Sequence, residues 1–324
     1  MKSKNASLKD VAELAGVSFT LVSKYLTNNP QARMSPETKE RIDNAIRKLN
    51  YRPSATARSL RYGRSHTIGF ISTNLTNPYH AHVVDLALRL ARTKGYQLLI
   101  ALDEAGNGDA ELIERLFASE VDGILLCGNV VLTGRPTCPI SIYDGAAKEV
   151  FHLGPDIMQP LADAMQNTGG SVGGLFFQRN WEEAFIATTR ELNREAYMLH
   201  CPIPLEERKE AIRKFLDEHR PELLITSGWH TLTMITEMFL PEMPDYNPRI
   251  VCQANCTGPF FDEPHIQGVI YSSTTELIRH SLDLLLAQIE DREQDEINPL
   301  IPARYISADD PEYRNFITRE FHLT

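Results

Sequence analysis

The sequence contains no long apolar run. A membrane-spanning helix needs about 20 consecutive, predominantly apolar residues, and no uncharged stretch of that length here is predominantly apolar. The first residues, Met1-Lys2-Ser3-Lys4, are polar and are not followed by the apolar segment typical of an export signal. We therefore expect a cytoplasmic protein without a membrane partner.

Cysteine is scarce, with 5 residues and no Cys-x-x-Cys pair, which favours free thiols over a disulfide framework. Cys252 and Cys256 lie near each other, but no second pair of ligands completes a zinc site. His80 and His82 are expected on different faces of a helix. The chain also lacks the phosphate-binding loop, the dinucleotide fingerprint and the Gly-x-Ser-x-Gly turn. The glycine cluster at 169–174 does not have the spacing of any of these motifs. These absences predict that the protein is not an enzyme and binds no cofactor or metal.

Charge is distributed unevenly along the chain. Residues 1–64 contain 13 lysines and arginines against 5 aspartates and glutamates, a net charge of +8. The remaining 260 residues contain 20 basic and 38 acidic side chains, a net charge of −18. A basic head on an acidic body is typical of a nucleic-acid-binding domain joined to a regulatory domain. Repulsion between the acidic body and phosphate would confine DNA contacts to the head.

The basic head has the pattern of short capped helices. Ser7 can cap a helix that begins at Leu8, and Val11 and Leu14 would continue its apolar face. Gly16 allows the chain to reverse before a second helix. A third helix is expected to start at Ser35-Pro36-Glu37. Its buried side chains would be Ile42, Ala45, Ile46 and Leu49.

The second helix is expected to run from its cap, Ser18, to Thr27. The side chains predicted to point inward are Leu21, Val22 and either Tyr25 or Leu26, and those predicted to point outward are Phe19, Thr20, Ser23 and Lys24. Two helices joined by a glycine-containing turn form the geometry that places the second helix in the DNA major groove. The outward side chains would then contact base edges and phosphates. The alternative is a three-helix bundle without a nucleic acid partner.

The segment 51–61 follows the third helix and is too short to form a stable isolated helix. We expect it to be mobile when free and helical when clamped on DNA. Leu60 lies between Arg58 and Arg61, which suits an apolar wedge inserted between base pairs from the minor groove. The alternative is that Leu60 packs on the body.

The sequence resembles LacI-type transcriptional regulators, the lactose-repressor family, over residues 7–128. The matching motifs are LKDVAELAGVSFTLVSKYL, YRPSATARSLR, HTIGFISTNLTNPYHAHVV, GYQLLIA and VDGILL. The resemblance implies a dimer whose recognition helices lie in the major groove and whose hinge helices lie in the minor groove. Together with the helix pattern, it gives the following candidate DNA contacts: Ser7, Ser18, Phe19, Thr20, Ser23, Lys24, Thr27, Tyr51, Arg52, Ser54, Ala57, Arg58 and Leu60.

The head also departs from the family pattern. Leu21 stands where relatives usually have a threonine that reaches phosphate, and Ser54 stands where they usually have asparagine. Phe19 and Lys24 are less usual at their positions. The operator sequence therefore cannot be inferred from relatives.

From Thr67 onward, short apolar runs alternate with helical stretches, which predicts an α/β body of doubly wound parallel sheets. About 260 residues exceed one such core, so we expect two lobes. The resemblance implies a body like that of periplasmic binding proteins, with three crossings between lobes, placed here near Leu153, Ser272 and Pro299. Lobe one would comprise residues 66–153 and 273–299, and lobe two residues 154–272 and 300–324.

Ligands of such folds bind beyond the carboxyl ends of the strands, here between the two lobes. Asn74 and Tyr79 follow the first strand and match the family's loop, whereas Asn77 is as well explained as a helix cap. Relatives that bind sugars or purines usually have an arginine where Trp181 stands. Trp229 and Asn255 also replace residues of the family's pocket, and both tryptophans could stack on a ligand or belong to the core.

The combination predicts a DNA-binding regulator, most simply a repressor, whose operator binding responds to a small-molecule effector such as a carbohydrate. A homodimer is the default, because the C-terminal tail has no leucine heptad. One alternative is a ligand-independent DNA binder with a degenerate cleft. A solute-binding module without a DNA role disagrees with the basic head and with the start of the chain.

Overall fold

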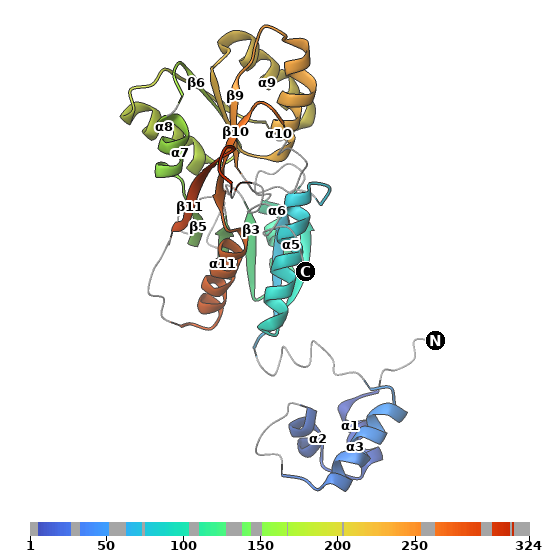
Figure 1. Cartoon of the computed structure of the whole chain (residues 1–324). Coiled ribbons are helices and arrows are strands. Elements are labelled where there is room, and N and C mark those ends of the chain that lie inside the picture. Colours follow the sequence, from blue (N-terminus) through green and yellow to red (C-terminus); the bar gives the residue numbers. More distant parts are fainter. Residues whose placement is uncertain are drawn as a thin grey trace. The chain divides into compact units, whose positions relative to one another are not determined.

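A computed structural model describes the chain in two compact units, residues 1–65 and 66–324. Within them the described residues are 6–26, 33–51, 63–72, 75–103, 110–127, 138–143, 151–166, 168–202, 204–253, 263–292, 300–311 and 313. The first unit is the head and the second unit is the body (Figure 1). No helix among these residues is long and apolar enough to cross a membrane.

The head consists of three helices, α1 (Leu8–Ala15), α2 (Phe19–Leu26) and α3 (Pro36–Lys48). Ser7 caps α1 as predicted: its hydroxyl accepts a hydrogen bond from the Asp10 amide at 3.3 Å, and the Ser7 amide donates to the Asp10 carboxylate at 2.7 Å. Gly16 ends the helix in the left-handed region, at φ 64°, where a side chain would be strained. Ser35 caps α3 by accepting a hydrogen bond from the Thr38 amide at 3.2 Å, without the reciprocal bond that Asp10 provides in α1. The predicted starts of the three helices are thus confirmed, whereas Thr27, the predicted end of the second helix, lies outside the described residues.

Two side chains of the head lie differently from their predicted positions. Leu14 is 46% exposed, because the buried side of α1 follows the i, i+4 row of Val11 and Ala15. Ser23 was expected to point outward and is only 4% exposed. It lies next to the fully buried Val22, where the middle of α2 packs against α1. Burial by a neighbouring helix therefore overrides the outward assignment of Ser23.

The first lobe of the body contains a parallel sheet in the order β2-β1-β3-β4-β5. Its strands are β1 (Thr67–Ser72), β2 (Gln97–Leu102), β3 (Gly123–Cys127), β4 (Ile140–Tyr143) and β5 (Phe151–Asp156). The helices of this lobe are α5 (Pro78–Thr93), α6 (Ala110–Ala118) and α11 (Thr274–Ile289). The middle strands are buried on both faces, as their continuous apolar runs require.

The second lobe has the strand order β11-β10-β9-β8-β6-β7, in which only the pair β10 and β11 is antiparallel. Its strands are β6 (Val172–Phe176), β7 (Ala196–His200), β8 (Leu223–Thr226), β9 (Arg249–Gln253), β10 (Ile266–Ser272) and β11 (Leu300–Ser307). Its helices are α7 (Met158–Gln166), α8 (Arg179–Glu191), α9 (Leu205–His219), α10 (Trp229–Thr233), the π-helix η1 (Met234–Phe239) and the 3₁₀-helix η2 (Leu240–Glu242). The predicted doubly wound parallel sheets are confirmed.

The strands β5 and β11 join the two lobes and lie side by side (Figure 1). β5 pairs with β4 as far as Leu153 and with β11 from Gly154 onward. β10 ends at Ser272, and the following helix α11 packs in the first lobe against α5, β3 and β4. Strand pairing is therefore continuous from one lobe to the other.

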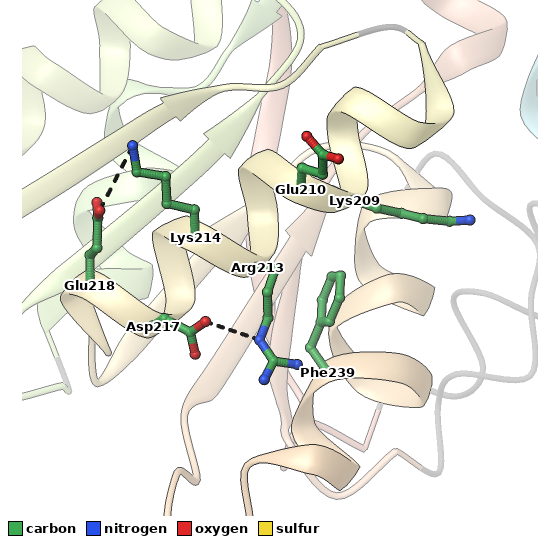
Figure 2. Close-up of a pocket in the computed structure, with 7 residues that line it drawn as sticks. All are labelled: Lys209, Glu210, Arg213, Lys214, Asp217, Glu218 and Phe239. Carbon is green, nitrogen blue, oxygen red and sulfur yellow. Dashed lines mark hydrogen bonds and ion pairs between the residues drawn. The ribbon is translucent and has the colours of Figure 1, made fainter.

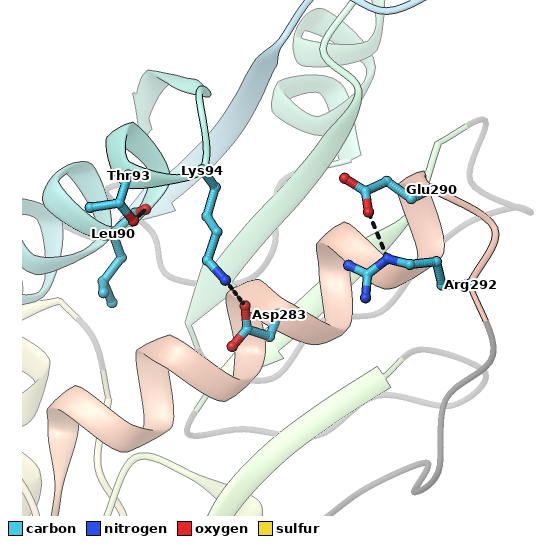
Figure 3. Close-up of polar contacts among 6 residues, drawn as sticks. All are labelled: Leu90, Thr93, Lys94, Asp283, Glu290 and Arg292. Carbon is cyan, nitrogen blue, oxygen red and sulfur yellow. Dashed lines mark hydrogen bonds and ion pairs between the residues drawn. The ribbon is translucent and has the colours of Figure 1, made fainter.

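Helix α11 completes the first lobe although it follows the second lobe in sequence. Ile278, Leu282 and Leu285 of α11 belong to the same buried cluster as Val83 and Ala87 of α5. An ion pair between Lys94 Nζ and Asp283 Oδ1, at 2.9 Å, links the end of α5 to α11 (Figure 3). Both partners are largely exposed, so this pair contributes little beside the apolar contact.

Some elements of the body were absent from the sequence-based prediction. β5 contains Gly154 and Pro155, residue types that are unfavourable within strands, so its sequence does not predict a strand. Its strand conformation is fixed by pairing with β4 and β11. Helix α7 and the helical stretch from α10 to η2 were also missed. The π-helix and the proline at 241 interrupt the regular helical periodicity there, so no 3.6-residue pattern is visible.

Candidate functional site

The first turn of α2 forms the exposed part of the helix-turn-helix. Ser18 precedes it, and its hydroxyl accepts a hydrogen bond from the Leu21 amide at 3.2 Å. Phe19 is 48% exposed and Thr20 is also exposed. A phenyl ring exposed at the start of a helix gains nothing from the head's own core. The residues that start a recognition helix are those that reach base edges in the major groove.

The other described candidates of the head are less exposed. Lys24 is half-buried, one turn along α2 from Thr20. Tyr51 packs against the head core, and burial raises its pKa. Ser7 is exposed, but its hydroxyl belongs to the capping box. Ser23 is buried, and a side chain so covered cannot meet a base edge without a change in the head.

Several predicted contacts lie outside the described residues. They are Thr27, Arg52, Ser54, Ala57, Arg58 and Leu60 of the head, and Asn74 and Asn255 of the body. The main chain of Trp229 begins α10, whereas its side chain is outside the description.

A group of polar and aromatic residues in the body lies at the carboxyl edge of the second-lobe sheet. The loop after β6 is held by a hydrogen bond from the Phe177 amide to Ser227 Oγ, at 3.3 Å. Gly228 follows with φ 88°, and a Cβ atom there would lie 2.9 Å from the Phe177 ring. The Phe177 ring therefore lies directly against the main chain at the N-terminus of α10, and a side chain at Gly228 would displace it.

Arg208 of α9 reaches this edge. Its side chain is buried, its Nε donates to the Pro202 carbonyl at 2.8 Å, and its guanidinium carbon lies 4.7 Å from the centre of the Phe177 ring. Burial lowers the pKa of Arg208, and the nearby Cys201 acts in the opposite direction. The guanidinium nevertheless stays protonated at neutral pH. The arrangement holds a planar cation against an aromatic face, with one donor fixed by the main chain.

Two histidines extend this cluster toward the first lobe. His230 of α10 has a pKa lowered by burial and by Arg208. His80 of α5 has a pKa lowered to about 4, mainly by burial and also by His230. His80 follows Asn77, which caps α5 by accepting a hydrogen bond from the Tyr79 amide at 3.0 Å. Arg208, His230 and His80 thus form a series of basic groups that includes residues of both lobes.

The neighbouring thiol is not a nucleophile. Cys201 follows β7, its amide donates to the Phe176 carbonyl at 2.7 Å, and its side chain is fully buried. Burial raises its pKa to about 12, which Arg208 only partly offsets, so the thiol is neutral near pH 7. Among the described residues no group of three or more histidine, cysteine or acidic side chains could hold a metal ion.

Trp181 and Tyr79 do not line an open site. Trp181 is 0% exposed and stacks on Phe176, with ring centres 5.9 Å apart, in a cluster that also contains Phe185. It lies on the inner stripe of α8. Tyr79 is buried in the first-lobe core with Phe70 and Ala87. Helical periodicity turns each ring into the core, which for Trp181 is the alternative that the sequence left open, and a pocket role for either residue stays a prediction.

The sequence did not suggest Arg208 or His230, and His80 was named only in the argument against a metal site, yet Arg208 had a detectable signal. Arg208, Ile212, Phe215 and Leu216 have the i, i+4, i+7, i+8 spacing of a buried stripe. A charged residue on such a stripe is an exception that merits a functional interpretation. The first turn of α9 also contains Glu206 and Glu207, which give the start of this helix the composition of a solvated face.

A hollow lies on the outer side of α9 (Figure 2). It has a volume of about 540 Å³ and is lined by Lys209, Glu210, Arg213, Lys214, Asp217, Glu218 and Phe239. Arg213 donates to Asp217 at 3.0 Å and also pairs with Glu242, and Lys214 lies 3.8 Å from Glu218. Its cations and anions pair with each other along the helix, so it offers no concentrated charge to a ligand.

Comparison with known proteins finds a family that the head resembles. Residues 7–54 match the family model described as bacterial regulatory proteins, lacI family. The sucrose operon repressor of Klebsiella pneumoniae is 39% identical over 128 residues, which are 39% of this chain and 38% of that repressor. The match therefore spans well under half of the relative's length.

Two solved structures share the fold at low sequence identity. The lac repressor dimer bound to operator and an anti-inducer has a TM-score of 0.75 at 17% identity, covering 94% of this chain and 98% of that one. The complex of the transcriptional regulator CelR with cellobiose has a TM-score of 0.60 at 17% identity, covering 94% and 100%. These likenesses establish the fold of head and body.

Proposed function

We propose that this chain, whose N-terminal domain belongs to the lacI family of bacterial regulatory proteins, is a transcriptional repressor controlled by a small effector. The observation that carries the proposal is the exposed first turn of α2 in a basic head that matches the family model. The head binds operator DNA, the body binds the effector, and no step of catalysis is involved. Because its target is chromosomal DNA, the protein acts in the cytoplasm.

On DNA, Phe19 and Thr20 read base edges in the major groove, and Lys24 contributes a phosphate contact. The N-terminus of α1, capped by Ser7, supplies a positive dipole end for a second phosphate contact. The hinge segment, including Ala57 and Leu60, enters the minor groove. Its role rests on the sequence motif alone.

The DNA-binding species is a homodimer. The outer strand β2 and the helix α5 expose large apolar side chains: Leu88, Leu99, Ile100 and Leu102. A sheet edge with exposed leucines invites pairing with another chain, and a second copy of the same surface is the simplest partner. The lac repressor, whose fold this chain shares, is described as a dimer on its operator. Two heads would then contact half-sites about one helical turn apart.

The effector binds between the lobes, beside the cluster of Arg208, His230 and His80. Relatives are named for sucrose or were solved with cellobiose, which supports a carbohydrate as the effector of this chain. Closing the lobes on a ligand changes the body that carries both heads, and so shifts the population of the DNA-binding form.

Selection of bound sequences from a random duplex library with the full-length protein tests the DNA function. The wild-type protein is expected to select a near-palindromic site. The variants Phe19→Ala and Thr20→Ala should bind this site with an affinity lower by roughly tenfold or more, and with a relaxed base preference. Thr38→Ala, on α3, is the control and should keep wild-type preference. Recovery of no preferred sequence, or equal binding of specific and random duplexes, would contradict the proposal.

A further inference from the structure

A hydrogen bond joins the C-terminal end of α2 to α3. The Tyr25 hydroxyl, in the last turn of α2, lies 2.8 Å and 2.9 Å from the two carboxylate oxygens of Asp43 on α3. The hydroxyl donates, and this bond is the largest cause of the raised pKa of Tyr25, so the group keeps its proton at neutral pH. The ring of Tyr25 packs against the head core.

The two ends of α2 are therefore fixed by different neighbours. The N-terminal end follows the turn at Gly16, where the Val17 amide donates to the Ala12 carbonyl of α1 at 3.0 Å. The middle packs against α1 through the buried Val22. The last turn is tied to α3 by the bond from Tyr25. A hydrogen bond to a carboxylate is directional and is stronger than one between neutral groups, so it restrains the orientation of the helix more than an apolar contact does.

The orientation of α2 decides where its first turn meets the bases. Val22 lies near the middle of this helix and is the point about which the helix can tilt. Side-chain groups of the first turn lie roughly 6 Å from that point. A tilt of about 10° therefore moves them by about 1 Å, which is twice the tolerance of about 0.5 Å for a binding group.

We propose that Tyr25 and Asp43 are positioning residues that set the base preference of the head through the orientation of α2. The inference rests on the proposed function, because it takes α2 as the helix that reads the operator. The alternative is that the bond only stabilises the head.

Two observations favour positioning over stabilisation. Val11, Val22 and Ile42, one from each helix, are fully buried, so the apolar core holds the three helices together without the bond. Asp43 is half-buried, so water can hydrate its carboxylate when the hydroxyl is removed, and the loss of the bond costs little stability.

The test compares the affinity of the full-length protein for its selected duplex and for a random duplex, at several salt concentrations. Tyr25→Phe removes the hydroxyl alone and should lower the ratio of the two affinities roughly tenfold. Its affinity for the random duplex and its salt dependence should stay at wild-type values, because non-specific binding depends on phosphate contacts. Hydrogen exchange of the α1 and α3 amides should also stay unchanged.

Two substitutions of Asp43 separate the hydrogen-bond acceptor from the charge. Asp43→Asn and Asp43→Ala both remove one negative charge from the head, so the electrostatic effect on DNA affinity is the same for both. Asparagine keeps an oxygen that accepts from Tyr25, and this variant should retain most of the wild-type ratio. Alanine has no acceptor and should match Tyr25→Phe, and the two changes combined should lose no more than either alone. Asn44→Ala, at an exposed neighbour on α3, is the control and should keep the wild-type ratio.

Wild-type ratios for Tyr25→Phe and Asp43→Ala would overturn the inference. A parallel loss of affinity for both duplexes, together with faster hydrogen exchange, would also overturn it, because that is the result of a purely stabilising bond. If Asp43→Ala does not fold, Tyr25→Phe and Asp43→Asn still decide the question. A wild-type protein that selects no sequence would refute the proposed function and the inference together, whereas a selective wild type with insensitive variants would refute the inference alone.

Discussion

Replacing His80 by glutamine should remove a large part of the acid sensitivity of the body. Burial holds the imidazole neutral in the folded protein and lowers its pKa to about 4 from an ordinary value of 6.5, and His230 acts in the same direction. In the unfolded chain the ring is hydrated and has its ordinary pKa. As the pH falls below about 6.5, the unfolded chain therefore binds a proton that the folded chain does not.

The sign and size of the effect follow from this difference. The folded pKa is lower than the unfolded one, so the contribution of neutral His80 is complete above about pH 6.5. It is lost as the pH falls toward about 4. Each pKa unit corresponds to about 1.4 kcal/mol, so a shift from 6.5 to about 4 gives a loss of about 3 kcal/mol. Glutamine has a similar volume and does not titrate, so the variant lacks this loss.

Urea denaturation followed by tryptophan fluorescence measures the free energy of unfolding between about pH 7.5 and about pH 4.5. Both tryptophans, Trp181 and Trp229, belong to the body, so the signal reports on that unit alone. The difference between wild type and His80→Gln should change by about 2 to 3 kcal/mol across this range. Carboxylates that titrate in both proteins cancel in the difference.

His280→Gln provides the control, because the His280 side chain is 52% exposed on α11. The difference from wild type should change with pH by more for His80→Gln than for His280→Gln. If the His80→Gln difference is constant with pH, the imidazole is not held neutral by burial. The assignment of His80 to a desolvated contact between the lobes would then be refuted.

Three further predictions concern the core, the caps and DNA affinity. In urea denaturation, Trp181→Ala should lower the free energy of unfolding of the body by about 3 to 5 kcal/mol, and Trp181→Phe should lower it by less. If Trp181→Ala is as stable as the wild type, Trp181 is not part of the core. Ser7→Ala should destabilise the head by about 1 kcal/mol, measured by hydrogen exchange of α1 amides, and unchanged exchange would deny the capping box. Lys24→Ala should reduce the slope of log operator affinity against log salt concentration by the amount that corresponds to about one phosphate contact, whereas Lys39→Ala on α3 should leave the slope unchanged. If Lys24→Ala has the wild-type slope, Lys24 does not contact a phosphate.

The head was predictable because its determinants are local. Ser7, Gly16 and Ser35 act on main-chain groups within a few residues, so their roles follow from type and spacing alone. Leu14 and Ser23 were misplaced because each stands at the margin of an apolar stripe. The angle at which two helices cross decides which edge of the apolar stripe is buried, and the local sequence does not specify this angle.

In the body, the alternation of strands and helices predicted the fold class, but elements defined by distant partners were missed. β5 is a strand because β4 and β11 pair with it, and β11 lies about 150 residues later in the chain. Candidate ligand residues were chosen by position in a motif, which selected the buried rings of Trp181 and Tyr79. Arg208 and His230 lie on different helices, so only the tertiary fold brings them together.

The substitution at Trp181 and the location of Arg208 bear on whether the cleft is degenerate. The family resemblance implies an arginine at position 181, and its replacement by a core tryptophan suggested the loss of a charged anchor. Helix α9 instead supplies a buried arginine whose guanidinium lies on Phe177, one residue beyond β6. The tryptophan at position 181 belongs to the core, so its presence does not by itself mark the cleft as degenerate.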